Sequence, residues 1–340
     1  MEIWNEEKLA DLLTRPSPDL LTDLKRIPGD IMILGAGGKM GPTLAILASR
    51  AVAAAGLDKR IIAVSRFSDT QAVQTLQDHQ VETISMDLGD QAALDRLPDV
   101  ANIIYLAGRK FGTQGQESQT WHMNASIPAL VTRRFRASRM VVFSTGNVFP
   151  LSPPSGGGCL DDSPLAPVGE YAMSTLARER IFEYAASQYG SAILIYRLNY
   201  AVDLHYGVLH DLAVKILRDE PISVRMPCFN CVWQGYANEV AIRSLLLADS
   251  PAAHLNVTGP ETVSVRQAAI LLGHHLGHVP VFEGEEADLA LLSNAGRCFE
   301  LFGYPSVSLN TLIRWQAEWL LAGGHTWNKP THFDEQRGNF

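Results

Sequence analysis

The sequence predicts an α/β fold in which a doubly wound parallel sheet is followed by a smaller, mostly helical C-terminal lobe. Between Asp30 and Arg197, short apolar runs alternate regularly with helix-like segments. Buried strands that alternate with helices indicate a parallel sheet covered on both faces. The first apolar run also leads directly into a glycine-rich turn, Gly35-Ala-Gly-Gly-Lys-Met-Gly41, and then into a helix. A strand, a tight turn and a helix in this order are typical of the first unit of such a sheet.

The regular alternation defines a first domain over residues 30–200. Its expected strands are 31–34, 61–64, 81–85, 102–106, 140–143 and 191–197, and its expected helices are 42–55, 69–78, 91–97, 118–135 and 170–189. The lobe, 201–325, is expected to be interleaved with this domain and to hold helices at 205–218, 236–247, 263–276, 289–302 and 308–322, with a short strand at 255–257. Residues 1–29 are predicted to be a helical extension packed on the domain, and residues 326–340 a polar, extended tail.

Composition restricts the class of protein. Hydrophobic residues make up 46% and charged residues 19% of the 340 residues, as in an ordinary globular protein. The net charge of −8 disfavours a nucleic-acid or anionic-membrane surface. There is no apolar run of about 18 residues, the length that a membrane span needs, and the four cysteines define no disulfide framework. We therefore expect a cytoplasmic protein with a small-molecule substrate, no nucleic-acid or membrane partner, and no metal site.

The glycine turn predicts a phosphate-binding loop. Its pattern is G-x-x-G-x-x-G on Gly35, Gly38 and Gly41, because Met40 occupies the place where G-x-G-x-x-G requires a glycine. Glycine allows the backbone to turn tightly and to approach a pyrophosphate, and the following helix N-terminus favours negative charge. The turn is not a Walker loop, since no Ser or Thr follows Lys39. An ordinary glycine turn is the alternative. Lys39 and Met40 are counted with the three glycines as cofactor contacts.

Residues that follow the other strands are the next candidates, because ligands bind at the carboxyl ends of parallel strands. Ser65 and Arg66 follow the second strand, where an acidic residue would hold the ribose hydroxyls of NAD and an arginine would accommodate the 2′-phosphate of NADP. This favours NADP over NAD, unless Arg66 is only a solvated loop charge. Further cofactor contacts are expected at Asp87, Leu88, Ala107 and Gly108, and two cations, Arg109 and Lys110, are placed near the mouth of the site.

Chemistry is expected at the end of the fifth strand. Ser144 and Thr145 place two hydroxyls there, which could hydrogen-bond a substrate carbonyl or alcohol, and Asn147 follows as a candidate substrate contact. A strongly periodic helix then begins near Glu170 and carries Tyr171 in a Tyr-Ala-x-Ser-x-Leu context.

These motifs together resemble the extended short-chain dehydrogenase/reductases, the NAD-dependent epimerase/dehydratase family. The resemblance extends over about residues 30–322 and implies a Rossmann-like fold with NAD or NADP as cofactor. It implies that Tyr171 is the acid/base, that Thr145 orients the reacting oxygen with Ser144 beside it, and that Asn124 steadies the active-site geometry. It further implies a homodimer formed through the helices at 118–135 and 170–189.

The chain departs from this family at position 175, where Thr175 replaces the Lys that lowers the pKa of the tyrosine. A free phenol has a pKa near 10 and is a poor base at neutral pH. Another cation could substitute, and Arg109, Lys110 and Arg178 are the candidates. Alternatively, the oxidised nicotinamide itself suffices for a slower reaction, or the protein binds cofactor without redox chemistry.

A second departure concerns the substrate. Nucleotide-sugar members often carry Arg-x-x-Asn and then Tyr-Gly-Pro after the sixth strand, whereas this chain has Arg197-Leu-Asn-Tyr, with Asn199 one place early and no Gly-Pro. Free sugars, sugar acids and other small polyols therefore stay open, with Asn199 and His205 as candidate substrate contacts. The leading hypothesis is an NAD(P)-dependent oxidoreductase or epimerase acting on a carbohydrate-like alcohol or ketone. The alternative is a non-catalytic dinucleotide-binding module, such as a cofactor sensor or a subunit.

Overall fold

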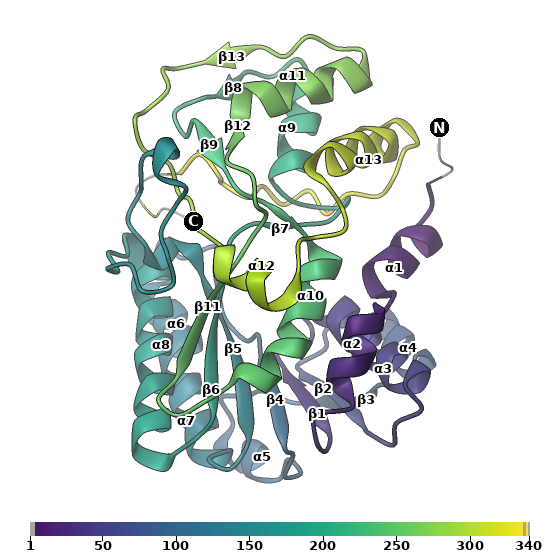
Figure 1. The fold of residues 1–340 in the computed structure, drawn as a ribbon, viewed down its shortest axis with the longest axis vertical. Coiled ribbons are helices and arrows are strands. Elements are labelled where there is room, and N and C mark those ends of the chain that lie inside the picture. Colours follow the sequence, from purple (N-terminus) through teal and green to yellow (C-terminus); the bar gives the residue numbers. More distant parts are fainter. Residues whose placement is uncertain (1–3, 336–337, 339–340) are drawn as a thin grey trace.

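A seven-stranded parallel sheet forms the centre of the computed structural model, which describes residues 4–335 and 338 (Figure 1). The strand order is β11-β6-β5-β4-β1-β2-β3. The strands are β1 (Ile31–Leu34), β2 (Ile61–Ser65), β3 (Glu82–Ser85), β4 (Asn102–Tyr105), β5 (Arg139–Thr145), β6 (Ile193–Leu198) and β11 (Ala253–Val257). The order reverses between β1 and β4, which pair directly, so the expected ligand crevice lies at their carboxyl ends. The predicted α/β fold is confirmed.

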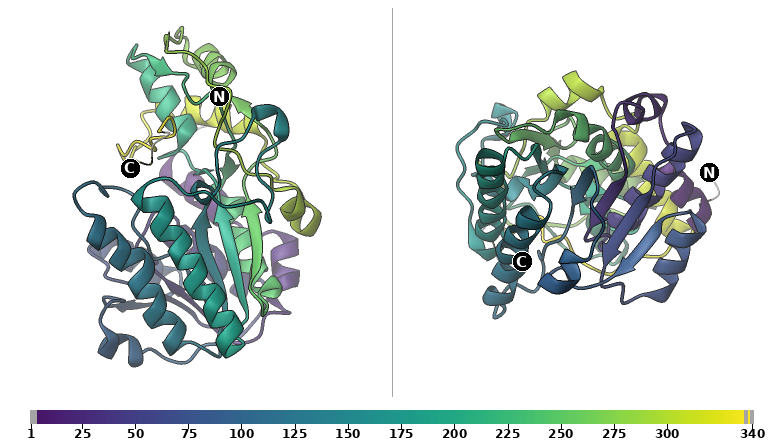
Figure 2. Two further views of the ribbon diagram at one scale, coloured as in Figure 1. Left: turned by 90° about the vertical axis from the view of Figure 1, so that its left-hand side faces the viewer. Right: turned by 90° about the horizontal axis from the view of Figure 1, so that it is seen from below.

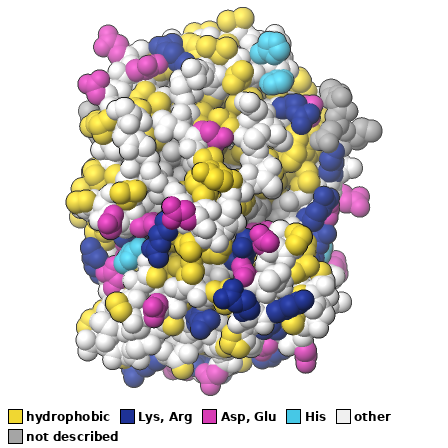
Figure 3. Space-filling model, in the orientation of Figure 1, with side chains coloured by type: hydrophobic (Ala, Val, Ile, Leu, Met, Phe, Trp, Pro, Cys, Tyr) yellow, Lys and Arg dark blue, Asp and Glu magenta, His cyan; other side chains and the backbone are white. Residues whose placement is uncertain are grey.

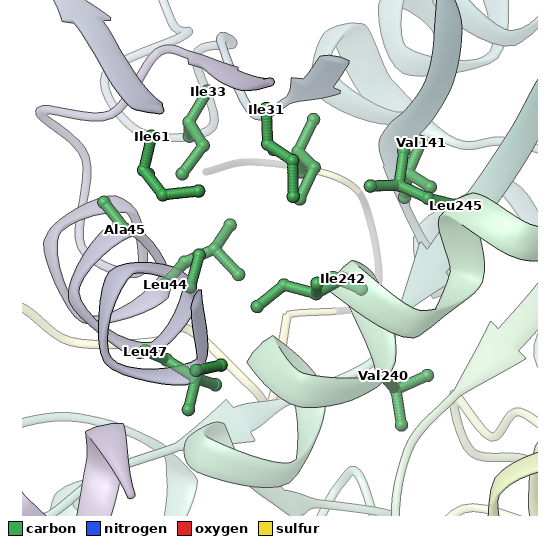
Figure 4. Close-up of a cluster of buried hydrophobic side chains, with 14 of the residues drawn as sticks. Ile31, Ile33, Leu44, Ala45, Leu47, Ile61, Val141, Val240, Ile242 and Leu245 are labelled. Atoms are coloured by element: carbon green, nitrogen blue, oxygen red, sulfur yellow. The ribbon is translucent and has the colours of Figure 1, made fainter. Parts of the chain in front are cut away.

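Helices cover both faces of the sheet (Figure 2). One layer contains α2 (Pro18–Leu24), α3 (Gly41–Ala54), α4 (Thr70–Asp78) and α10 (Gln234–Arg243), and the other contains α5 (Gln91–Asp95), α7 (Ile127–Arg134) and α8 (Gly169–Tyr189). Successive strand residues point to opposite faces. In β1, Ile31 and Ile33 therefore pack with α3 and α10 (Figure 4), whereas Met32 and Leu34 pack with α7 and α8. This double burial explains why β1 is apolar throughout.

The lobe has its own core above the carboxyl ends of the strands. It is built on the helices α9 (Val208–Leu217), α11 (Val265–Leu276) and α13 (Leu309–Leu321). Three short two-stranded sheets complete it: β7 (Ala201–Val202) pairs with β10 (Val232–Trp233), β9 (Cys228–Phe229) with β12 (Val263–Ser264), and β8 (Ile222–Ser223) with β13 (Phe282–Glu283).

The N-terminal extension is divided between the core of the lobe and the core of the sheet domain. Its first helix, α1 (Glu6–Thr14), belongs to the lobe core, where Trp4 packs edge-on against Trp315 with ring centres 5.3 Å apart. Its second helix, α2, packs on the sheet domain.

Two expected helices differ in the structure. The helix expected over 118–135 consists of α6 (Glu117–Trp121), a π-helical segment (His122–Ser126) and α7. Pro128 has no N–H to donate to the carbonyl four residues earlier, and the Ile127 N–H instead bonds the carbonyl of His122, five residues back. The prediction of a helix over 289–302 is wrong for the first half of that range, because the helix there, α12, covers only Gly296–Phe302.

The segment after residue 200 contributes to both parts of the molecule. β11 pairs with β6 in the main sheet, and α10 packs against α3, while the helices around them build the lobe. The tail from His325 to Glu335 contains no helix or strand and returns over the lobe. Trp327 stacks on His205 with ring centres 5.3 Å apart, and the Thr331 N–H donates to Asp211 at 2.7 Å.

The exposed face in Figure 3 shows acidic and basic side chains of the described residues interspersed with one another. No helix within the described part of the chain is both long enough and apolar enough to cross a lipid bilayer.

Candidate active site

Two adjoining cavities lie at the carboxyl edge of the sheet, with volumes of about 490 Å³ and 350 Å³. Both are lined by Gly35, Gly38, Leu106 and Gly108, so they meet at the glycine turn. The larger cavity extends toward β2 and β3, and the smaller one lies between the sheet domain and the lobe. Two connected compartments on either side of a glycine turn at the switch point fit a dinucleotide, with one half in each.

The glycine turn is shaped by close backbone approaches. Gly35 has φ +89°, and a Cβ there would lie 2.5 Å from the backbone nitrogen of Ala107. A Cβ on Gly41 would lie 2.2 Å from the carbonyl oxygen of Ala36. No side chain caps the N-terminus of α3, which begins directly after Met40. The turn and this helix end therefore fit a pyrophosphate, whose charge the helix N-terminus favours.

The larger cavity contains most of the residues expected to hold the adenosine half of a cofactor. It is lined by Ser65, Arg66, Asp87, Leu88 and Ala107 in addition to the shared glycines. One carboxylate oxygen of Asp87 already accepts from the backbone N–H of Gly89 at 2.8 Å. Phe67, which also lines this cavity, adopts φ +40°. A left-handed conformation of a bulky residue is strained, and such strain is found preferentially at functional sites.

The smaller cavity brings Tyr171 together with Thr145. Both side chains line it, and they share a hydrogen bond. Tyr171 lies in the first turn of α8 and Thr145 ends β5. Burial raises the pKa of the Tyr171 phenol, whereas the Thr145 hydrogen bond, the positive charge of Arg178 and a hydrogen bond with Thr175 act in the opposite direction. The structure thus places a buried phenol, a hydroxyl hydrogen-bonded to it and a cation that lowers its pKa in one cavity.

Ser144 has a different environment from Thr145. Its hydroxyl donates to the carboxylate of Glu179, which also accepts two hydrogen bonds from the guanidinium of Arg197, at 2.8 and 3.0 Å. Glu179 is fully buried. Ser144 therefore satisfies a buried ion pair, and Thr145 is the hydroxyl beside the phenol.

The two hydroxyls are expected to respond differently to substitution. Ser144→Ala should lower the free energy of unfolding by about 1–3 kcal/mol, the usual cost of removing one partner of a buried polar group. It should change turnover less than tenfold (about 1.4 kcal/mol). Thr145→Ala should lower kcat by about 100- to 1,000-fold, the range for losing one donor at a reacting oxygen. Urea unfolding and steady-state kinetics on both variants measure the two effects. Equal losses of turnover would contradict the distinction.

Arg178 is a cation whose charge acts on the Tyr171 phenol, in a site where position 175 carries a threonine. Its guanidinium is buried and lines the smaller cavity. It donates to the side-chain oxygen of Asn124 at 2.7 Å and to the carbonyl of Phe143 at 2.9 Å. Gly108 makes room for it, since a Cβ there would lie 2.3 Å from the arginine Nη2.

Asn124 joins this cation to the loop after β4. It lies in the π-helical segment, its oxygen accepts from the backbone N–H of Arg109 at 2.8 Å, and its amide donates to the Arg109 carbonyl and to Ser174, both at 2.9 Å. Together with the hydrogen bond that Asn124 accepts from Arg178, these bonds connect the loop after β4 to α8, which carries both Ser174 and Arg178. A side chain so enclosed positions its neighbours.

The remaining candidates divide between the cavity and its surroundings. The smaller cavity is lined by Lys39, Met40, Gly41, Arg109, Lys110, Asn147 and Asn199. Arg109 directs its guanidinium at its own loop, donating to the carbonyls of Phe111 and Gly112 and to Gln119. His205 does not line this cavity and instead contacts Glu6 at 2.9 Å.

Several lining residues were not predicted. They are Phe111, Tyr200, Tyr206, Gln234 and Thr331. Tyr200 has φ +46°, which no local sequence signal indicates. Thr331 comes from the tail and Tyr206 from the lobe, so only the tertiary structure could bring them to this cavity.

Two groups within the described residues have the composition of a metal site. Glu6, His205 and His325 form one, and Glu179, Glu183 and His254 form the other, each with its ligand atoms within 4.8 Å of one another. Each group contains a side-chain hydrogen bond of 2.9 Å, between His205 and Glu6 in the first group and between His254 and Glu183 in the second. Neither group lines the two cavities.

The fold and the site together define the class of this protein. The model of the NAD dependent epimerase/dehydratase family matches residues 31–212. This match spans more than half of the chain, and the protein belongs to that family. The resemblance inferred from the motifs is thereby confirmed, and the family is one of enzymes. A search among curated proteins found no match.

Solved structures show the same fold at low sequence identity. UDP-glucose 4-epimerase from Thermotoga maritima has a TM-score of 0.67 and 16% identity, covering 86% of this chain and 99% of its own. UDP-glucuronic acid 4-epimerase from Bacillus cereus, in complex with NAD, has a TM-score of 0.70 and 16% identity, and the match covers 86% of this chain and 98% of the epimerase chain. dTDP-glucose 4,6-dehydratase from Streptomyces venezuelae, with NAD bound, has a TM-score of 0.73 and 16% identity, and the match covers 86% of this chain and 97% of the dehydratase chain.

Proposed function

We propose that this protein is an NAD(P)-dependent oxidoreductase or epimerase that acts on a carbohydrate-like alcohol or ketone. The observation that carries the proposal is the Tyr171–Thr145 pair, which lines a cavity that adjoins the larger one at the glycine turn. A proton donor and an orienting hydroxyl beside a dinucleotide-shaped site are the groups that hydride transfer to or from a carbon–oxygen bond requires. Family membership supports the same class of reaction.

Each side chain has a distinct part in this proposal. A bound nicotinamide would supply or accept the hydride. Tyr171 exchanges a proton with the substrate oxygen, and Thr145 holds that oxygen by a hydrogen bond. Arg178 acts through Tyr171, because its positive charge favours the phenolate and so lowers the phenol pKa. Asn124 keeps Arg178 in place.

The substrate is proposed to be smaller than a nucleotide sugar. The solved relatives include enzymes named for UDP-glucose, UDP-glucuronic acid and dTDP-glucose. In this chain, Asn199 and Tyr200 replace the sequence pattern expected for nucleotide sugars, and Thr331 of the tail lines the cavity of about 350 Å³. These features support a free sugar, a sugar acid or another small polyol.

Arg66 supports a preference for NADP, although the two solved relatives named above with a nicotinamide cofactor hold NAD. Arg66→Ala is expected to weaken NADPH binding by about 10- to 100-fold, because a charge-assisted hydrogen bond to a phosphate is lost. NADH binding should change less than threefold (about 0.7 kcal/mol). Fluorescence titration with each cofactor measures both values. An equal effect on the binding of the two cofactors would show that Arg66 does not distinguish NADPH from NADH.

A homodimer through the helical segment expected over 118–135 (α6, the π-helical segment and α7) and through α8 is the proposed assembly. The outer face of α8 exposes large apolar side chains, with Met173 at 44% and Tyr184 at 59% exposure. Exposed apolar groups clustered on one helix are typical of an interaction surface.

Two measurements on the purified protein test the function. The first is titration with NADPH and NADH, and the second is turnover on a panel of sugars, sugar acids and polyols, followed by reduced-cofactor absorbance and by product analysis for redox-neutral epimerisation. Cofactor binding with turnover supports the proposal. Cofactor binding without turnover would favour the alternative that Thr175 suggests, a non-catalytic dinucleotide-binding module. Binding of neither cofactor would overturn both.

A further inference from the structure

We propose that Lys39 and Lys110 form an oxyanion-binding subsite in the smaller cavity, so that the substrate carries a carboxylate or phosphate group. This inference rests on the proposed function, because it names the substrate class of the same site. It narrows the carbohydrate-like substrate to an acidic one. The argument starts from the environment of Lys39.

The ammonium group of Lys39 is buried and, within the described part of the chain, has no hydrogen-bond acceptor. Its Nζ lies 3.1 Å from the ring centre of Tyr206 and 4.7 Å from that of Phe111. Aromatic faces attract a cation but replace only part of its hydration. Burying a charge without a counter-ion costs free energy, so a bound anion would stabilise the protonated Lys39 ammonium here.

Lys110 approaches the same position from the loop after β4. Its Nζ lies 5.3 Å from the Phe111 ring centre and 5.8 Å from that of Tyr171. Two lysine ammonium groups therefore lie near the Phe111 ring, within the cavity that also contains the proposed acid/base. An anionic group held between these cations would place the rest of a small substrate beside the phenol.

The pKa of each of the two lysines lies below its ordinary value in this environment. Burial, and then repulsion from Lys110 and Lys329, lowers the pKa of Lys39 to about 7, although Asp211 and Asp203 oppose the shift. Burial likewise lowers the pKa of Lys110 to about 8. The Asp211 carboxylate already accepts hydrogen bonds from the backbone and side chain of Thr331. An incoming anion would stabilise the protonated form of both lysines.

The geometry distinguishes a substrate anion from the cofactor pyrophosphate. Lys39 belongs to the glycine turn, but its ammonium reaches toward Tyr206 and Phe111, which line only the smaller cavity. Neither lysine lines the larger cavity. The subsite therefore faces the lobe, on the substrate side of the turn.

Sulfate is a suitable test anion, because its charge is constant across the pH range of interest. Calorimetric titration of the cofactor-saturated protein should show sulfate binding that Lys39→Met weakens by about 10- to 100-fold, the effect of losing a charge-assisted hydrogen bond. Lys39→Arg should retain binding. Lys25→Met, which removes an exposed charge from the sheet domain, should leave it unchanged. Absence of sulfate binding, or equal losses in Lys39→Met and Lys25→Met, would overturn the proposal.

Two further readouts separate this proposal from the others. If Lys39→Met weakens NADPH or NADH binding and leaves sulfate binding intact, the lysine serves the cofactor and the subsite is refuted. Lys39→Met should also unfold at a higher temperature than the natural protein, because a buried, unpartnered charge is removed. A lower unfolding temperature would contradict that reasoning. Since these readouts need no turnover, they remain decisive if the proposed reaction fails.

The pH dependence has a defined sign. Lys39 is protonated below about pH 7 and loses its charge above it, so sulfate affinity should be highest on the acidic side and should fall between about pH 6 and about pH 9. Lys39→Arg should bind sulfate with a weaker pH dependence, since arginine keeps its charge. An affinity that does not change with pH in the natural protein would count against Lys39 as the anion-binding group.

Discussion

Replacing Tyr171 with Phe is expected to lower kcat by about 100- to 10,000-fold, the usual contribution of a positioned general acid or base. The ring stays in place, so cofactor affinity and thermal stability should change little. Steady-state kinetics on an active substrate, with cofactor titration and thermal unfolding as controls, measure these effects. Unchanged turnover in Tyr171→Phe would refute the proposed mechanism.

The position of Tyr171 also sets the expected pH profile. Burial raises the pKa of its phenol, and Thr145, Arg178 and Thr175 oppose the rise. In the oxidative direction the phenolate is the base, so kcat/KM should increase with pH through the phenol pKa and then level off. The profile of Tyr171→Phe should lack this rise.

Replacing Arg178 with Met is expected to lower kcat in the oxidative direction by about 10- to 1,000-fold and to move the pH profile toward higher pH. The physical reason is that a phenol without a neighbouring cation ionises less readily, and each pKa unit corresponds to a tenfold loss of phenolate at a given pH. The kinetics should be measured across a pH series, because a merely structural loss would lower activity without moving the profile. A profile that stays in place would assign the supporting charge to Lys110 or to the oxidised nicotinamide.

A second substitution provides the control for this prediction. Arg178 bonds Asn124 and the carbonyl of Phe143, so its removal also costs stability. Thr175 lies one turn closer to Tyr171, and i and i+4 positions share a helix face. Thr175→Lys introduced into Arg178→Met should therefore restore part of the turnover and return the pH profile toward its original position. Thr175→Lys alone should change the profile less, because the cation is already present.

Much of the central fold could be predicted from local pattern. β1 is apolar at every position because both faces are covered. Gly41 is required by a backbone approach within its own turn, and Gly35 by one to Ala107, just after β4. The helix containing Asn124 shows where such reasoning stops. Its apolar spacing predicts one continuous helix, whereas the structure has a π-helical segment just before Pro128, in which Asn124 contacts α8 and the loop after β4. Those contacts join residues that are distant in sequence.

The sequence by itself determined the strand, glycine turn and helix at the start of the sheet domain, which arise from local periodicity and from glycines at fixed spacing. The resemblance to the family, and not the spacing alone, made Tyr171, Thr145 and Thr175 the candidate residues for the proposed chemistry. Only the tertiary structure decided that Arg178 stands beside the phenol, that Ser144 serves the buried Glu179, and that Lys39 meets Tyr206 in the cavity. Partners and burial follow from long-range packing, which brings α8, the lobe and the tail to one edge of the sheet.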